Sequence, residues 1–199
     1  MAGTMPAVTA TAPRTALGDQ LVIEGGTPLH GRIQVGGNKN GALPIIAACL
    51  LTEQECVIEN VPRIRDVEVM AELVASTGAE VEWLERNTLR IKAAGDITPA
   101  IDRALSVRIR ASILLAGPLL ARCGAVVVPP PGGDVIGRRR LDTHFLALEQ
   151  LGAVHEFGDR IRFTTKGLVG ADIFLDEPSV TGTENAIMAA VAEIGRAHV

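Results

Sequence analysis

Apolar residues along this chain switch between helical spacing and short continuous runs, and they do so twice in the same order. The first occurrence is LPIIAACLLTEQECVIENVP at residues 43–62, and the second is ASILLAGPLLARCGAVVVPP at 111–130. Each predicts an apolar helix, a short break, and a strand that ends at a proline. The segments that follow, from Asp66 and from Arg140, match as well: helical spacing, then Gly-Ala, then a strand. Such ordered repetition indicates two related structural units.

The first unit is predicted to combine strands with two helices. In order, we predict a strand at 32–35, a glycine-rich loop at 36–40, a helix at 42–51 and a strand at 56–61. Apolar residues at helical spacing from Val67 to Val74 predict a second helix that ends at Gly78, where a residue without a side chain favours a helix stop. A hairpin of residues 81–84 and 89–92 closes the unit.

The second unit repeats this plan, and a third unit starts after it. We predict a helix at 106–121 bent near Pro118, a strand at 125–128, a helix at 141–151 that ends at Gly152, and a hairpin of 154–157 with 161–164. A strand at 173–176 and a helix from Glu184 then open a third unit that is cut. The pattern predicts an α/β fold of repeated βαββαβ-like units. Two complete units and a cut third indicate a domain of three such repeats that is truncated in this chain.

The two ends of the chain differ from the repeats in composition. Residues 1–18 are rich in Ala, Thr and Pro and lack the apolar core of a signal peptide, so we predict a disordered leader. Residues 193–199, EIGRAHV, continue neither the helix pattern nor the repeat, and their back-translation resembles a sequencing adapter. We predict a non-native tail, and a genuine short tail is the alternative.

Composition and charge narrow the functional classes. With 47% hydrophobic residues the chain can form a core, whereas 3% aromatic residues argue against a base-stacking surface for nucleic acid. The net charge of −4 offers no general attraction to nucleic acid or to a membrane, so an anionic ligand needs a local cluster of cations. No apolar run is long enough to span a bilayer. Cys49, Cys56 and Cys123 lack metal-ligand spacing and suit reduced thiols in a cytoplasm.

Two glycine-rich loops carry most of the candidate chemistry. In GGNKNGALP, residues 36–44, backbone N–H groups at a helix start and the Lys39 ammonium could meet an anion, while Asn38 and Asn40 could cap the helix or bind a ligand. In PGGDVIGRRRLD, residues 131–142, Asp134 lies between glycines and three arginines follow it. Arginine suits phosphate because its planar fork donates paired hydrogen bonds. Solvated surface loops are the alternative for both.

Other polar residues have weaker signals. Arg108 and Arg110 interrupt an apolar helix, either as ligand contacts or as solvated stems. Ser179, Thr181 and Thr183 precede the last helix, where capping is the favoured role. His144 and His155 show no metal-ligand spacing, and we interpret both as structural or solvated.

At these loops the chain resembles the UDP-N-acetylglucosamine 1-carboxyvinyltransferases of the enolpyruvyl transferase family. The similar segments are GGNKNGALPI, ENVPRIRDVEVM with LVASTGAEVE, RIRASILLAGPLLAR, PGGDVIGRRRLDTHFLALEQLGA and PSVTGTENAIMAA, between about Leu21 and Ala192. The resemblance implies an inside-out α/β barrel of two domains, each of three repeats. It assigns residues 19–38 to the second domain and 39–192 to the first, whose third repeat is cut; most of the second domain is absent.

The resemblance also implies the roles of individual residues. Lys39 and Asn40 would contact phosphoenolpyruvate, Arg110 would contact the nucleotide sugar, and Arg139 would contact both. The substrate-binding residues it implies are Lys39, Asn40, Arg110, Arg139, Arg140, Leu141, Asp142, Thr143, Glu177, Pro178, Ser179 and Val180. Asp134 takes the position of the proton donor, where most relatives carry Cys, so no covalent thiol adduct and no sensitivity to fosfomycin are expected. Arg140 and Thr143 also depart from the usual Pro and Leu.

The implied reaction moves the enolpyruvyl group of phosphoenolpyruvate to the 3-hydroxyl of UDP-N-acetylglucosamine and releases phosphate, without a metal or organic cofactor. The implied partners are these two substrates and the missing C-terminal domain, with no nucleic acid and no membrane, in the cytoplasm. Three alternatives stay open: 3-phosphoshikimate 1-carboxyvinyltransferase, a non-catalytic substrate-binding fragment, and a repeat-based scaffold. The first of these should show a GNAGTxxR signature, where this chain reads VRIRASILLAG.

Overall fold

The structure, a computed structural model, describes residues 25, 26, 28, 30–133 and 140–193. Residues 1–35 and 36–199 form two separate units, which we describe by themselves. In the first unit the predicted strand at 32–35 is wrong: these residues form no strand, and Ile33 and Val35 are 91% and 84% exposed. An extended segment becomes a strand only when a neighbour completes its hydrogen bonds, and the described residues supply none.

The second unit contains the helices and strands of the molecule's described part. Its first repeat comprises α1 (Lys39–Ala48), the 3-10 helix η1 (Cys49–Leu51), β1 (Glu55–Ile58), α2 (Arg65–Ser76), β2 (Glu80–Glu85) and β3 (Thr88–Lys92). Its second repeat comprises α3 (Arg103–Ser106), the 3-10 helix η2 (Arg110–Leu115), α4 (Ala116–Cys123), β4 (Ala125–Val128), α5 (Asp142–Gln150), β5 (Val154–Phe157) and β6 (Ile161–Thr164). The helix α6 (Val180–Glu193) follows.

The two repeats fold into sheets of identical topology, which confirms the duplication predicted from the sequence. The strand orders are β1-β3-β2 and β4-β6-β5, with antiparallel pairing throughout. Ile91 faces Cys56 and Val81 in the first sheet, and Phe163 takes the equivalent place in the second. The α/β class is confirmed. Within a repeat the two adjacent strands come last, after the second helix, rather than between the helices as the βαββαβ order has them.

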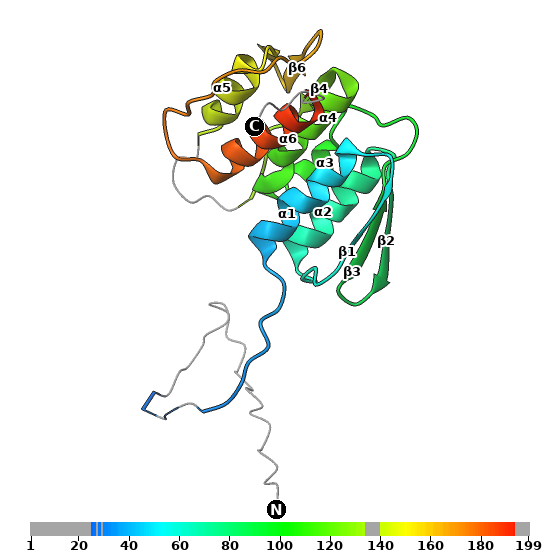
Figure 1. Cartoon of the computed structure of the whole chain (residues 1–199), viewed down its shortest axis with the longest axis vertical. Helices are drawn as coiled ribbons and strands as arrows, with labels where there is room; N and C mark the ends of the chain where they lie inside the picture. The colour runs from blue at the N-terminus through cyan, green and yellow to red at the C-terminus, as the bar shows by residue number, and fades with distance from the viewer. Residues whose placement is uncertain (1–24, 27, 29, 134–139, 194–199) are drawn as a thin grey trace, which may run out of the picture. The chain divides into compact units, whose positions relative to one another are not determined.

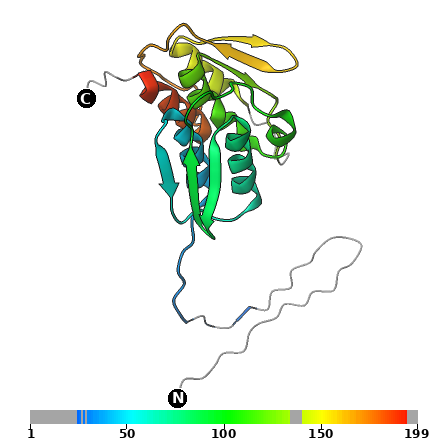
Figure 2. The ribbon, with the colours of Figure 1, turned by 90° about the vertical axis from the view of Figure 1, so that its right-hand side faces the viewer.

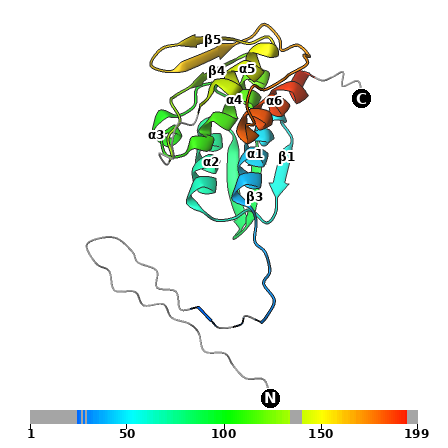
Figure 3. The ribbon, with the colours of Figure 1, turned by 90° about the vertical axis from the view of Figure 1, so that its left-hand side faces the viewer.

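The helices lie inside and the sheets lie outside. In Figure 1 the helices α1, α2, α4 and α6 gather between the first sheet on one side and the second sheet at one end of this unit. Figure 2 shows the first sheet from its outer side, and Figure 3 shows α1 and α2 in front of it from the opposite side. Each sheet therefore has one face on the helical core and one face toward solvent, as antiparallel sheets allow.

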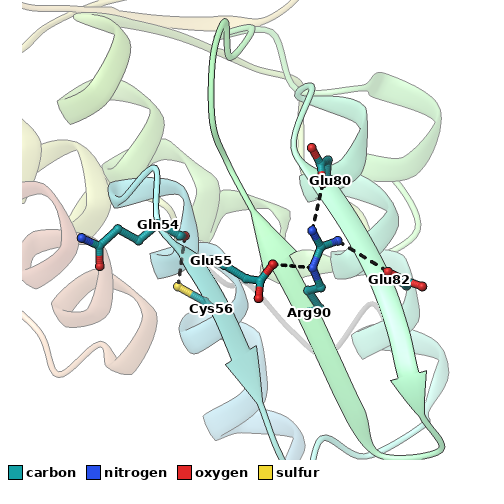
Figure 4. Close-up of polar contacts among 6 residues, drawn as sticks. All are labelled: Gln54, Glu55, Cys56, Glu80, Glu82 and Arg90. Atoms are coloured by element: carbon teal, nitrogen blue, oxygen red, sulfur yellow. Dashed lines mark hydrogen bonds and ion pairs between the residues drawn. The ribbon is translucent and has the colours of Figure 1, made fainter.

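Alternation along β3 fixes which face of the first sheet is buried. Leu89 and Ile91 are fully buried against the helices. Arg90 points to the other face, where its guanidinium lies 2.7 Å from Glu55, 3.1 Å from Glu80 and 3.5 Å from Glu82 (Figure 4). A shift of one residue would bury Arg90 and expose Leu89, so this arrangement specifies the register.

The predicted helix at 106–121 is interrupted, but not where the sequence suggested. The chain breaks at Val107–Ile109, between α3 and η2, and the Ser112 hydroxyl bonds to the carbonyl oxygens of Ser106 and Ile109 across the break. Pro118 causes no break, since it lies in the first turn of α4, where a missing N–H costs nothing. The predicted strand at 173–176 is also wrong, because no neighbouring strand among the described residues pairs with it.

Several helix boundaries follow the sequence signals. Gly78 and Gly152 adopt positive φ angles of 104° and 91° after α2 and α5, as predicted. α1 begins earlier than predicted, at Lys39, because the Asn38 side chain accepts a hydrogen bond from the N–H of Gly41 at 3.1 Å. β4 and the second hairpin have the predicted bounds.

A close helix approach joins α4 to α6 at Gly117. A Cβ atom at this position would lie 2.6 Å from the carbonyl oxygen of Asn185 and 2.8 Å from its Oδ1. The absence of a side chain therefore lets the backbones of the two helices meet. This contact positions α6, whose start lines the site described below.

A methyl group at Gly117 should push α6 away from α4. We expect Gly117→Ala to lower the free energy of unfolding by about 1–3 kcal/mol, the usual cost of overpacking, measured by chemical denaturation. Gly41→Ala is the matched control, because a Cβ atom there meets nothing within 4 Å. The control should be unchanged or stabilised by up to about 1 kcal/mol. Equal effects of the two substitutions would contradict the close approach.

Candidate functional site

A cleft of about 1190 Å³ lies where several segments distant in the sequence meet. The starts of α1, α2, η2 and α6 all contribute to its wall. Its lining residues are Lys39, Asn40, Leu43, Arg65, Asp66, Val107, Arg108, Ile109, Arg110, Ala111, Leu114, Gly133, Arg140, Glu177, Pro178, Ser179, Val180, Thr181 and Glu184.

Of the three α-helices that begin at the cleft, α1 and α6 have a side-chain cap, whereas α2 has none. Asn38 caps α1, and the Ser179 hydroxyl accepts the N–H of Gly182 at 3.1 Å at the start of α6. The predicted capping role is therefore confirmed for Ser179 and is wrong for Thr181 and Thr183, which lie within α6. The backbone N–H groups and the positive ends of both helix dipoles lie at the cleft, which favours an anionic ligand there.

Cations outnumber carboxylates on the wall, by five side chains to three. The Lys39 ammonium is 2.8 Å from the Asp66 carboxylate, and Arg108 is 2.8 Å from Glu72. The Arg110 guanidinium donates to the carbonyl oxygen of Arg140 at 3.2 Å. These contacts hold the cationic side chains over the cleft while leaving each of them partly exposed.

Arg140 is held by carboxylates on two sides. It pairs with Asp142 on α5 and lies 3.8 Å from Asp176 and 3.9 Å from Glu177. The guanidinium lowers the pKa of Asp142 and keeps it ionised, chiefly through their direct hydrogen bond. Arg140 therefore bridges α5 to the segment that leads into α6.

The structure brings eight of the predicted site residues to one cleft. They are Lys39, Asn40, Arg110, Arg140, Glu177, Pro178, Ser179 and Val180. Three neighbours in the sequence do not line it: Leu141 packs against the core, Asp142 pairs with Arg140, and Thr143 is buried. Asp134 and Arg139 lie outside the described residues, although the adjoining Gly133 lines the cleft.

Sequence reasoning missed Arg65, Asp66 and Glu184, which also line the cleft. Arg65 and Asp66 open α2, in the first repeat, and their helix runs beside α1. The available signal was their place at the start of an amphipathic helix next to the glycine-rich loop. Glu184 lies in the first turns of α6, and partial burial raises the pKa of its carboxyl group.

The glycines before Asp134 are needed for packing. A Cβ atom at Gly132 would lie 1.6 Å from the carbonyl oxygen of Val107, and one at Gly133 would lie 2.9 Å from the Arg110 nitrogen. Gly133 also has a positive φ angle of 92°. The base of this loop is thereby fixed against the segment that carries Arg108 and Arg110.

A buried histidine lies behind the wall. His144 on α5 is 2% exposed, and its imidazole bonds to Asn185 at 2.8 Å and to Thr181 at 3.2 Å. Burial, and secondarily the charge of Arg110, lowers the pKa of His144 to about 4. The imidazole is therefore neutral at physiological pH, and the structural interpretation of His144 is confirmed.

The described residues hold no group of three or more His, Cys, Asp or Glu side chains that could bind a metal ion. In the same part of the chain, no helix combines the length and apolar character needed to cross a bilayer. The chemical resources of the cleft are therefore cations, backbone N–H groups, carboxylates and hydroxyls.

A family model described as EPSP synthase (3-phosphoshikimate 1-carboxyvinyltransferase) matches residues 23–199. The chain belongs to this family. Curated relatives with high similarity are named UDP-N-acetylglucosamine 1-carboxyvinyltransferase. One from Bradyrhizobium diazoefficiens is 64% identical over 88% of this chain and 41% of its own length. One from Treponema denticola is 53% identical over 86% of this chain and 40% of its own length.

Solved structures of enolpyruvyl transferases share the fold. NikO from Streptomyces tendae superimposes with a TM-score of 0.66 at 21% identity, covering 85% of this chain and 39% of its own. EPSP synthase from Acinetobacter baumannii superimposes with a TM-score of 0.63 at 18% identity, covering 80% of this chain and 37% of its own. The fold expected from the sequence resemblance is thus confirmed. The chain spans about two fifths of the length of the curated relatives it matches.

Titration of His144 should appear in the pH dependence of stability. Its pKa is lower in the folded state, about 4, than the ordinary value of 6.5, so the unfolded chain binds the extra proton between these values. The stability that the neutral His144 contributes is fully present above pH 6.5 and is lost as the pH falls toward 4. We expect the free energy of unfolding, measured by urea denaturation, to fall by about 3 kcal/mol over this range.

His144→Gln is the control, since glutamine does not titrate. Its free energy of unfolding should fall less steeply over the same pH range. Parallel pH curves for the two proteins would show that His144 is not buried in its neutral form.

Proposed function

We propose that this chain forms the first substrate-binding part of an enzyme that transfers the enolpyruvyl group of phosphoenolpyruvate to the 3-hydroxyl of UDP-N-acetylglucosamine. The reaction releases phosphate and is the first committed step of peptidoglycan synthesis, in the cytoplasm. The observation that carries the proposal is the convergence of Lys39, Arg110 and Arg140 on one cleft, in a chain 64% and 53% identical to relatives of that name.

The electrostatics of the cleft support two anionic substrates. Phosphoenolpyruvate carries a phosphate and a carboxylate, and the nucleotide sugar carries a diphosphate. Fixed cations and helix N-termini stabilise such groups without reorganisation, which lowers the barrier when charge develops during reaction. Lys39 and Asn40, in the first turn of α1, would contact phosphoenolpyruvate, while Arg110, Arg140 and Glu177–Val180 would contact the nucleotide sugar.

The proposed chemistry is addition followed by elimination. The sugar 3-hydroxyl oxygen bonds to C2 of phosphoenolpyruvate while C3 gains a proton, and the hydroxyl proton leaves to a base. The resulting tetrahedral intermediate loses a proton from C3 and expels phosphate from C2, which restores the double bond. A general base from the remaining part of the complete enzyme would take the hydroxyl proton, so this chain alone would bind substrates weakly and catalyse little.

Asp134 would donate the proton to C3. A donor must be protonated, whereas neighbouring cations favour the carboxylate. Binding of the anionic phosphoenolpyruvate and exclusion of water would favour the protonated form. Asp134 would therefore act as an acid only in the substrate complex.

The choice of acceptor separates the two enolpyruvyl transferases. The family model carries the name of the shikimate enzyme, while the curated relatives with high identity carry the name of the nucleotide-sugar enzyme. Phosphate release by the complete enzyme with phosphoenolpyruvate and either acceptor tests this directly. We expect turnover with UDP-N-acetylglucosamine and none with 3-phosphoshikimate, and the opposite preference would overturn the proposal.

Removal of the Lys39 charge should impair the reaction. We expect Lys39→Met in the complete enzyme to reduce kcat/KM for phosphoenolpyruvate by about a hundredfold or more, measured by phosphate release. Lys166→Met is the control, because Lys166 is an exposed lysine outside the cleft. Similar rates for both variants would remove Lys39 from the site.

Substitutions of Asp134 should separate acid catalysis from binding. In the complete enzyme, Asp134→Asn should lower kcat by about a hundredfold, since an amide cannot supply the proton. Asp134→Cys should keep activity and gain sensitivity to fosfomycin, which alkylates a thiol. Normal turnover of the Asn variant would refute the assigned role.

A further inference from the structure

One side chain is completely buried between three helices behind the cleft. Asn185 on α6 has no solvent exposure, and its amide makes three hydrogen bonds. Its Oδ1 accepts the N–H of Gly117 on α4 at 2.8 Å. Its Nδ2 donates to the carbonyl oxygen of Ile113 on η2 at 2.8 Å and to Nδ1 of His144 on α5 at 2.8 Å.

The backbone partners fix the orientation of this amide. A backbone N–H can only donate and a backbone carbonyl can only accept. The atom facing Gly117 must therefore be the oxygen, and the atom facing Ile113 must be the nitrogen. Rotation of the amide by 180° would place its NH₂ group against the N–H of Gly117 and its oxygen against the carbonyl oxygen of Ile113. Neither pair could form a hydrogen bond, and the site has no exposure to water.

The fixed amide in turn selects the tautomer of His144. Because Asn185 donates to Nδ1, this nitrogen carries no proton, and the neutral imidazole must be protonated at Nε2. The Nε2–H then faces the hydroxyl oxygen of Thr181, 3.2 Å away. Thr181 is therefore the acceptor in this hydrogen bond.

Thr181 stands between the buried relay and the cleft. It is half-buried, and it lines the cleft in the first turn of α6. Among the described residues its hydroxyl has no hydrogen-bond partner besides His144. Since its oxygen accepts from His144, the hydroxyl hydrogen is available to another acceptor, and the cleft is the space next to it.

We propose that the relay Gly117–Asn185–His144 fixes Thr181 as a hydrogen-bond donor to an oxygen of the ligand in the cleft. Thr181 is a binding residue, and His144 and Asn185 are positioning residues. The ligand oxygen is an acceptor with negative charge, since five cationic side chains line the same cleft; a phosphoryl oxygen of the nucleotide sugar fits this chemistry. The identity of this ligand rests on the proposed function.

The relay is tested first without any ligand. Nitrogen-15 NMR of the imidazole side chains of this chain at pH 7 distinguishes an Nδ1–H from an Nε2–H tautomer. We expect the buried His144 to give the neutral Nε2–H signature. A neutral Nδ1–H form, or an imidazolium, would overturn the relay independently of what the cleft binds.

The donor is tested by calorimetric titration with UDP-N-acetylglucosamine. Thr181→Val keeps the shape of the side chain and removes the hydroxyl, and we expect about tenfold weaker binding. Thr181→Ser keeps the donor and should bind within about twofold of the unchanged chain. Denaturation curves of both variants check that the fold is retained.

The outcomes separate this proposal from the proposed function. If the unchanged chain and Thr181→Val bind the nucleotide sugar equally well, Thr181 is not a donor to the ligand, while the proposed function stands. If the unchanged chain binds 3-phosphoshikimate instead and Thr181→Val weakens that binding, the donor role stands and the proposed function falls. If neither ligand binds the unchanged chain, the proposed role of Thr181 as a donor to a ligand fails. The hydrogen-bond relay itself is then judged only by the NMR result for the Nε2–H tautomer of His144.

Discussion

The contact between α6 and the helices α4 and α5 is the constraint on which the cleft depends. α6 carries Ser179–Thr181 at its start, and only its docking brings that segment near α1 and η2. Two features determine the docking: the bare backbone at Gly117, which permits close approach, and the Asn185 amide, which bonds to three neighbouring elements. A buried amide with all three bonds specifies one position of the helix, because any displacement leaves polar groups unsatisfied.

Duplication explains why cations from separate segments meet. Lys39 opens α1 in the first repeat and Arg110 opens η2 in the second, and both of these helix starts line the same cleft. α6 adds a third helix start beside them. The sheets lie on the outside and carry ion pairs such as that of Arg90 with Glu55, which stabilise register and contribute nothing to the cleft.

Much of this arrangement follows from local sequence rules. The helix stops at Gly78 and Gly152, the two hairpins and the duplication were predicted, because periodicity and glycine placement act over a few residues. The strands at 32–35 and 173–176 could not be judged in this way, because a strand exists only with a neighbour. The break at Val107–Ile109 depends on the buried Ser112 hydroxyl, a tertiary contact without a local signal.

The site itself was predictable only in part. Its cations and loops stood out in the sequence, but the pairing of Lys39 with Asp66 and the buried relay behind Thr181 arise from packing between distant segments. The central claim is that these segments form one binding site for an anionic nucleotide sugar. Residue-resolved ¹H–¹⁵N NMR of this chain during titration with UDP-N-acetylglucosamine tests it most directly. Amide signals of Lys39, Asn40, Ala111 and Thr181 should shift together along one binding curve; shifts confined to the outer sheet, or none at all, would contradict the account.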